Sequence, residues 1–415
     1  MMVSSDAAVW LAASPSAWPT APEYMSFSTL SELEACPRRW ALSAAAYPEV
    51  WENQGYPRAL HTAAMEGTVA HLALDMITRA FADCGCPSVR DPGAIAILRE
   101  LGGFTEVIRQ AIDKTLRWYH GNPRAVPAVD RMRRHLTART AALRSRVQGF
   151  LSRVRLEARP RTGPSHRYDN AQHQDLRDEL LTGSHSEVHL VVEELGWKGV
   201  ADLITLSESA CEIRDFKTGA PKEDHHLQLR IYAVLWWLDR VRNPTGRLAD
   251  RLVISYDPGD VEVIAPSVSM LESLRSELGA RRVAAIQTLD VDPPEARPSA
   301  TTCAYCGVRH LCDAYWRTPF PPEGQGAWFT DIQLELTARH GTTSWDGVVE
   351  SCSGLARRSR ILLRTIDIPF DLCPGMQVRV LNVRVSAPDV DSAEGEPAPA
   401  VASMGLASEI FVLPG

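Results

Sequence analysis

Alternating apolar and polar positions near the middle of the chain predict two adjacent β-strands. The runs at 199–204 and 213–217 are rich in strand-forming residues, and the polar break Ser207-Glu208-Ser209 between them predicts a hairpin. Side chains alternate along a strand, so Asp215 and Lys217 point to one face. Asp202 lies on the partner strand, where a plausible register brings it near Asp215. The hairpin therefore predicts two carboxylates and one amine close together.

Helical periodicity flanks this hairpin on both sides. Apolar residues recur every three or four positions over 66–82, which predicts a helix with His71 near its middle. The run 224–238, after a turn at 218–221, predicts a second helix with Gln228 and Tyr232 on one face. A strand beginning at Glu187 is expected before the hairpin. A strand pair at 251–264 and a helix over 270–286 are expected after the second helix.

Paired carboxylates beside a lysine suit phosphodiester chemistry. A hard cation such as Mg²⁺ or Mn²⁺ prefers carboxylate oxygens and also binds phosphate. Lys217 could orient or help deprotonate the attacking water, or stabilise charge on the phosphate oxygens. Taken alone, an Asp-x-Lys triplet is common and usually forms an ion pair on a solvated strand face. Glu187 could add a carboxylate to the site or be exposed.

Four short motifs in order make the pattern more specific. They are Gly67-x-x-x-His71, Gly199-x-x-Asp202, Asp215-x-Lys217-Thr-Gly and Gln228-x-x-x-Tyr232. This series resembles the PD-(D/E)xK nucleases over roughly residues 26–316. The nearest branch comprises the RecB and AddB nuclease domains and the CRISPR-associated RecB-like exonucleases.

The resemblance implies an α/β fold with a restriction-endonuclease-like core. It also implies that His71, Asp202 and Asp215 hold the metal, that Lys217 is catalytic, and that Gln228 and Tyr232 support the site and the DNA. Many relatives carry Glu where this chain has Asp215. The shorter side chain could alter the number or preference of metals.

Nine cysteines in a chain expected to be cytoplasmic suggest metal ligation before disulfides. Three of them, Cys303, Cys306 and Cys312, have C-x2-C-x5-C spacing, and Cys36 is the obvious fourth ligand. Cys36 followed by Pro-Arg-Arg, with a C-terminal trio, resembles the iron–sulfur subset of RecB-like nucleases and implies a [4Fe-4S] cluster. Zinc is the strongest alternative, because four thiolates also suit zinc. Either metal would join the start of the nuclease domain to its end.

Charge is distributed unevenly along the chain. The net charge is −7, which does not indicate nucleic-acid binding by itself. Residues 109–161, however, hold fourteen basic residues against three acidic ones, a local balance of +11. We expect a helical insertion over about 90–160 whose arginines contact DNA phosphates, in particular Arg131, Arg133, Arg134 and Arg139. The alternative is a surface that pairs with acidic loops elsewhere in the chain.

A proline- and glycine-rich stretch at 319–326 predicts the clearest domain boundary. Beyond it, five strand-like runs at 328–337, 345–351, 359–366, 376–385 and 409–413 suit a small OB-like barrel, and 386–403 reads as a loop. Arg358 and Arg360, within a basic stripe at 357–364, could follow a single DNA strand, with Trp328, Phe329 or Trp345 stacking on bases. A protein-docking module is the alternative.

These patterns predict a flexible leader at 1–25, a nuclease domain at 26–318 and an OB-like β domain at 327–415. No apolar run is long enough for a membrane helix, and the leader lacks the basic start of a signal peptide, so we expect a cytoplasmic location. The expected function is metal-dependent cleavage of DNA, on single strands or free ends, in repair, CRISPR adaptation or phage defence. The alternative is a catalytically silent DNA-binding or scaffold subunit of a helicase–nuclease or defence complex. No Walker A pattern is present, so any helicase motor would be a separate partner.

Overall fold

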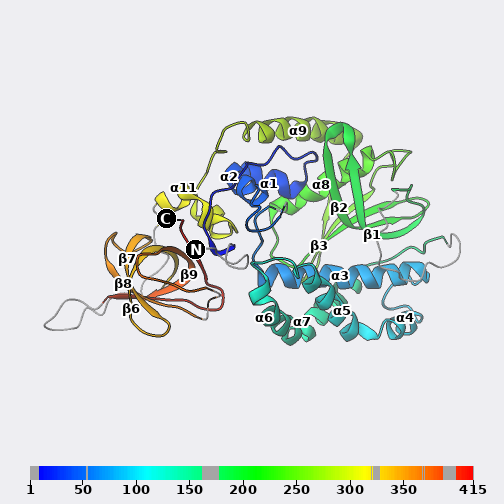
Figure 1. The fold of residues 1–415 in the computed structure, drawn as a ribbon. Helices are drawn as coiled ribbons and strands as arrows, with labels where there is room; N and C mark the ends of the chain where they lie inside the picture. The colour runs from blue at the N-terminus through cyan, green and yellow to red at the C-terminus, as the bar shows by residue number, and fades with distance from the viewer. Residues whose placement is uncertain are drawn as a thin grey trace.

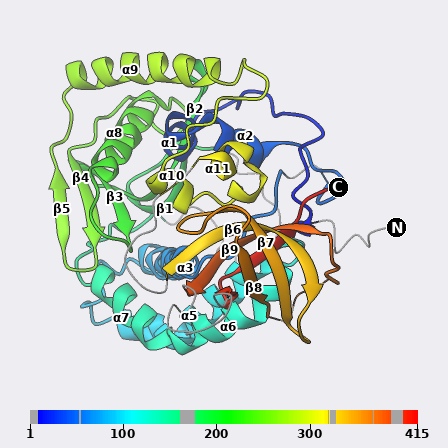
Figure 2. The same ribbon diagram turned by 90° about the vertical axis from the view of Figure 1, so that its left-hand side faces the viewer.

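A computed structural model describes residues 9–52, 55–160, 177–318, 320, 328–366, 368, 370–386 and 399–414. A larger α/β part lies beside a smaller β-barrel (Figure 1). The chain forms the α/β part first and the barrel last, as the colours from blue to red indicate in both views (Figures 1 and 2). None of the helices within these ranges is long and apolar enough to cross a membrane.

The α/β part is built on a five-stranded sheet with the strand order β1-β2-β3-β4-β5. The strands are β1 (Gly183–Val192), β2 (Trp197–Leu206), β3 (Cys211–Lys217), β4 (Arg251–Tyr256) and β5 (Asp260–Val263). Neighbouring strands are antiparallel except β3 and β4, which are parallel. Parallel neighbours need a crossover connection, and α8 (Glu223–Leu238) provides it. The predicted hairpin of β2 and β3 and the predicted helix after it are both confirmed.

Helices cover both faces of this sheet (Figure 1). On one face α8, α1 (Phe27–Ala35) and α9 (Val268–Gln287) bury a core with residues of the strands. On the other, the 22-residue α3 (Thr62–Asp83) packs with the predicted helical insertion. The insertion comprises α4 (Ala94–Glu100), α5 (Gly103–Arg117), η2 (Val126–Ala128), α6 (Val129–Ala138) and α7 (Thr140–Leu151). Leu203 and Phe216 of the sheet join this second core, so the helices cover the hairpin that carries the motifs.

Short elements complete the α/β part. They are α2 (Pro37–Ala44), η3 (Glu193–Leu195), α10 (Ala300–Ala304), η4 (Arg309–Leu311) and α11 (Asp313–Arg317). Pro37 stands at the first position of α2, where its missing N–H is not needed. The segment 299–317, which carries three of the four candidate cysteine ligands, lies next to α2 and faces the barrel (Figure 2).

The C-terminal strands close into a five-stranded barrel. Its strands are β6 (Trp328–Arg339), β7 (Ser344–Cys352), β8 (Arg360–Arg364), β9 (Gln377–Ser386) and β10 (Ala400–Ser403). The ring closes because β10 pairs with both β8 and β9. A further strand, β11 (Glu409–Val412), pairs with β9 outside the ring and forms a bridge with Leu11.

The sequence therefore indicated the right number of barrel strands but the wrong fifth one. We expected 409–413 to close the barrel and 386–403 to be a loop, whereas β10 lies at the end of that stretch. β10 is four residues long and contains two alanines, so its pattern is too weak to stand out from the adjacent Pro/Ala-rich stretch. Strand pairing with β8 and β9 on both sides overrides this weak propensity.

The barrel packs directly against the α/β part. Arg309 and Asp331 form a buried ion pair between η4 and β6, and Arg124 of the insertion pairs with Glu409 of β11 at 2.7 Å. Trp10, in the described part of the predicted leader, packs on Phe411. Val9, Trp10, Ala12 and Met25 of the predicted leader are buried, while many of the residues between Ala12 and Met25 are exposed. Except for Phe320, the predicted boundary at 319–326 lies outside the described residues.

Candidate functional site

Three acidic residues form a row across three adjacent strands. Ser186 pairs with Leu203 and Val188 with Ala201, so Glu187 of β1 lies opposite Asp202 of β2. Leu203 pairs with Arg214, so the next pair across β2 and β3 is Asp202 and Asp215. The Phe216 N–H donates to the Asp202 carboxylate at 2.6 Å and fixes that side chain. The register thus concentrates negative charge at one place on the sheet.

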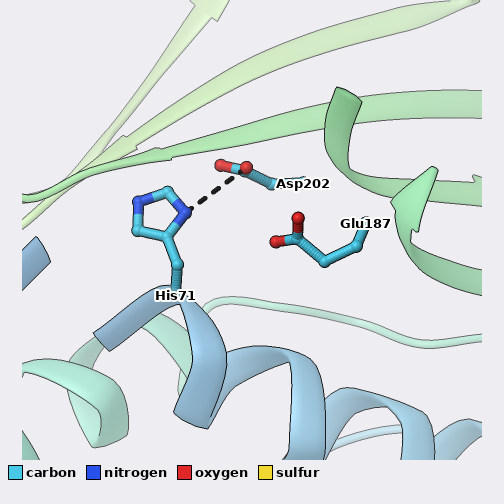
Figure 3. Close-up of side chains that lie close together, drawn as sticks. All are labelled: His71, Glu187 and Asp202. Carbon is cyan, nitrogen blue, oxygen red and sulfur yellow. Dashed lines mark ion pairs between the residues drawn. The ribbon is translucent and has the colours of Figure 1, made fainter. Parts of the chain in front are cut away.

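His71 of α3 meets this row from the helical side (Figure 3). Its Nδ1 lies 3.3 Å from Asp202 Oδ1. Donor atoms of His71, Glu187 and Asp202 all lie within 4.8 Å of one another, and this is the single group of that kind among the described residues. An imidazole and two carboxylates are a suitable ligand set for a divalent cation.

The electrostatics reflect burial and crowding of charge. Burial opposes protonation of His71, but the charge and hydrogen bond of Asp202 outweigh it and raise the pKa of His71 to about 9. Burial, followed by the charges of Asp202 and Asp75, raises the pKa of Glu187 to about 7. Burial and the charge of Asp202 likewise raise the pKa of Asp215 to about 7. Such a cluster favours a cation that neutralises the carboxylates.

Glu187 is held in an unusual backbone conformation. Its φ is 49°, in the left-handed region that favours glycine. A non-glycine residue in this region costs free energy, and such residues concentrate at functional sites. We left Glu187 open as either a ligand or an exposed residue. The structure brings it to His71 and Asp202 within the 4.8 Å group, and that group does not include Asp215.

A chain of polar contacts runs from Asp215 into α8. Lys217 Nζ lies 2.8 Å from Asp215 Oδ2 and donates to Gln228 Oε1 at 2.8 Å. The Gln228 amide in turn donates to the Tyr232 hydroxyl at 2.7 Å. The helical spacing of Gln228 and Tyr232 thus brings the two side chains together next to Lys217. These contacts hold the Lys217 amine beside Asp215.

The glycines of the first two motifs have a steric explanation. A Cβ at Gly199 would lie 2.9 Å from the ring of Tyr232, so only glycine lets β2 pass this close to α8. A Cβ at Gly67 would lie 3.1 Å from Thr218 Oγ1, just after the catalytic candidate Lys217. Both glycines therefore allow the helices that carry His71 and Tyr232 to approach the strands closely.

Four buried cysteines line a small cavity. Cys36 lies between α1 and α2, Cys303 lies in α10, Cys306 follows it, and Cys312 caps α11. All four line one cavity together with basic residues, including Arg39 and Arg309. Four thiols that line one cavity could hold either of the two metal centres that the sequence suggests, a [4Fe-4S] cluster or one zinc.

The arginines expected to contact DNA are partly engaged in ion pairs. They lie on α6 or at its end. Arg133 pairs with Asp113, and Arg139 lies 3.3 Å from Glu66. For Arg131 and Arg134, no ion pair with another described residue is present. The insertion thus combines phosphate-contact candidates with the internal pairing that we weighed as the alternative.

The barrel exposes some, but not all, of the side chains that we expected to contact a single DNA strand. Arg358 lies 3.6 Å from Glu350, and Arg360 is exposed. Trp345 is buried in the barrel core, so it is not available to stack on a base. Phe329 is 76% exposed and keeps that possibility.

Comparison with protein-family models gives an extended match. The family model described as the PD-(D/E)XK nuclease superfamily matches residues 24–313. No curated protein matches significantly.

Solved structures give limited likenesses. SSO0001 is 23% identical over 32% of this chain, with a TM-score of 0.20, and the match spans 61% of SSO0001. The p204 HINb domain is 7% identical, with 53% of this chain and 87% of that domain covered and a TM-score of 0.17. A murine DNA-binding protein bound to double-stranded DNA is 7% identical, with 56% and 96% covered and a TM-score of 0.16. These TM-scores are too low to bear on the fold.

Proposed function

The chain belongs to the PD-(D/E)XK nuclease superfamily, and from this premise we propose that it is a metal-dependent deoxyribonuclease that hydrolyses phosphodiester bonds in single-stranded DNA or at DNA ends. The observation that carries this proposal is the convergence of His71, Asp202 and Glu187 beside the contact chain Asp215–Lys217–Gln228–Tyr232. An ordinary ion pair on a solvated strand face would need neither the buried carboxylate of Asp215 nor a histidine from α3.

The residues fit a divalent cation by their donor set. His71, Asp202 and Asp215 are the ligands that the sequence motifs suggest, and the donor distances add Glu187. When bound there, Mg²⁺ or Mn²⁺ would supply Lewis acidity and lower the pKa of a water molecule. His71 must be neutral to act as a ligand, so it would release the proton that Asp202 stabilises in the metal-free protein.

Lys217 would act on the phosphate. Gln228 and Asp215 hold its amine between them, so the positive charge is positioned before the substrate arrives. A positioned charge stabilises the negative charge that develops on the phosphate oxygens without reorganising during the reaction. Gln228 and Tyr232 would act through Lys217 by keeping its amine in place.

We place the chain in the RecB-like branch, with Cys36, Cys303, Cys306 and Cys312 holding a [4Fe-4S] cluster. Support comes from the shared cavity of the four buried thiols and from the Cys-Pro-Arg-Arg and C-x2-C-x5-C patterns that carry them. The cluster would join the region around α2 to the segment 299–317 and would have a structural role. The biological processes that we propose for this activity are DNA repair, CRISPR adaptation or phage defence.

Cleavage of end-labelled single- and double-stranded DNA, with and without Mg²⁺ or Mn²⁺, tests the proposal. Lys217→Ala should lower kcat about 100- to 1000-fold, because one preorganised electrostatic group is lost. Lys198→Ala, an exposed lysine on β2, is the matched control and should retain activity. Wild-type rates from Lys217→Ala would refute the proposal. A wild-type protein that binds DNA and metal without cleaving would favour the silent scaffold subunit.

A further inference from the structure

Trp118 is a large apolar residue without a place in either core. It caps the C-terminal end of α5, and 61% of the residue is exposed. Within the described chain, its indole has no aromatic partner, no cation–π partner and no hydrogen bond. The next residue, Tyr119, packs instead against the core of α3, α5 and α7. Leaving so much of an indole in water forgoes the stabilisation that burial of a tryptophan usually brings.

This exposed indole lies on the candidate active site. Trp118 lines the same cleft as His71, Glu187 and Asp202, and the cleft has a volume of about 630 Å³. That volume lies within the range of ordinary ligand pockets, roughly 300–1000 Å³. The cleft therefore has room for a nucleotide beside the metal-ligand group.

The wall of the cleft between these residues is smooth. Ala63, Ala64, Gly67 and Thr68 line it and lie on one face of α3, in the two turns before His71. Side chains of this size let the backbone of a bound strand come close to the helix. The wall leads from the start of α3 to His71, so a strand following it would reach the carboxylates.

We propose that Trp118 stacks on an unpaired base of the DNA strand and thereby positions the neighbouring phosphate at His71, Asp202 and Glu187. The proposal rests on the nuclease function proposed above and adds a positioning residue to it. Aromatic platforms bind single strands in this way, because every base has a π-face. In a duplex the faces of each base are covered by its neighbours, so stacking on Trp118 would first require unstacking a base. The site should therefore favour a single strand over a blunt duplex.

The test compares Trp118→Ala, Trp118→Phe and the control Ile264→Ala, which alters an apolar residue that is 78% exposed beyond β5. Cleavage of a short single-stranded oligonucleotide should show KM raised about 5- to 150-fold for Trp118→Ala, with a smaller change in kcat. Trp118→Phe should recover most of the loss, because it keeps an aromatic face, and Ile264→Ala should match the wild type. The same oligonucleotide in a blunt duplex should show a smaller effect of Trp118→Ala.

A second measurement does not depend on cleavage. A single-stranded oligonucleotide containing 2-aminopurine is titrated with Lys217→Ala protein in the presence of Mg²⁺, with and without Trp118→Ala. Stacking should quench the fluorescent base only where Trp118 is present. An unchanged KM with unchanged quenching would overturn the inference, and so would equal losses in Trp118→Ala and Trp118→Phe. If the wild type fails to cleave at all, the nuclease proposal fails, and the quenching alone decides the role of Trp118.

Discussion

Asp331 offers a sharp test of how the barrel is attached to the rest of the protein. This β6 residue is 9% exposed, and its carboxylate accepts a hydrogen bond from Arg309 Nε at 2.5 Å and another from the Tyr315 hydroxyl at 2.8 Å. The Asn382 N–H donates to it at 2.8 Å. Arg309 and Tyr315 both line the four-cysteine cavity. One carboxylate on the barrel therefore holds two residues of the cysteine segment.

Asp331→Asn keeps the size of the side chain and removes its charge. Arg309, 7% exposed, would then keep only neutral acceptors, Asn382 Oδ1 at 2.9 Å and the Cys306 carbonyl at 3.2 Å. Removing one partner of a buried ion pair costs about 3–5 kcal/mol, because the other charge remains buried without compensation. The amide oxygen of Asn can still accept one bond, so we expect a loss of about 3 kcal/mol. Total stabilities are about 5–15 kcal/mol, so this loss is large.

Urea unfolding of the full chain, followed by circular dichroism, measures this loss. The double variant Asp331→Leu, Arg309→Met should recover much of it, since buried pairs replaced by apolar residues are often neutral in stability. Arg357 pairs with Glu350, and its side chain is 75% exposed. Arg357→Ala should therefore lower the free energy of unfolding by at most about 1 kcal/mol. A loss below about 1 kcal/mol for Asp331→Asn, or a double variant less stable than the single one, would refute the reasoning.

Three further predictions follow from other parts of the molecule. Protein purified without oxygen should be brown and contain iron, and Cys306→Ala should bleach and destabilise it; one zinc without iron would contradict the cluster. Arg134→Glu should lower DNA affinity on all sequences and reduce the salt slope by about one unit, whereas Arg133→Glu should have less effect because Arg133 is already paired with Asp113. Truncation near residue 321 should give a protein of low solubility and poor iron content, and a soluble truncation with full iron would show that the barrel is dispensable.

The sequence predicted the β2–β3 hairpin and α8 well because their signals are local. The break at 207–209 and the strand-like runs around it determine the hairpin, and the hairpin register places Asp202 opposite Asp215. The helical spacing of Gln228 and Tyr232 likewise brings their side chains into contact with each other, and Gln228 accepts from Lys217. Short-range patterns of this kind survive in the fold because no competing contact overrides them.

Glu187 could not be assigned to the site from such patterns. Its position depends on the register in which β1 pairs with β2, which the sequence did not predict. It also depends on a backbone φ of 49°, which the residue type glutamate does not indicate. Ion pairs of the basic stretch 109–161 could not be predicted for a similar reason. Arg146 pairs with Asp257 and Arg153 with Asp260, acids that are more than a hundred positions away in sequence. Counting charged residues within one stretch of sequence cannot reveal acidic partners that are distant along the chain.

The same limit applies to the division into domains. A proline- and glycine-rich stretch marks where the chain changes from helices to strands, but it carries no information about what packs across the change. His310 of the cysteine segment stacks on Phe411 of β11 with ring centroids 3.7 Å apart, and Arg379 of β9 donates to the His310 carbonyl at 2.6 Å. Arg124 of the helical insertion is fully buried against Glu409. Cutting the chain at the boundary would expose these apolar faces and leave Arg124 and Arg309 without their carboxylates. The barrel and the cysteine segment should therefore fold as one unit, with the proposed cluster and the ion pairs stabilising the same junction.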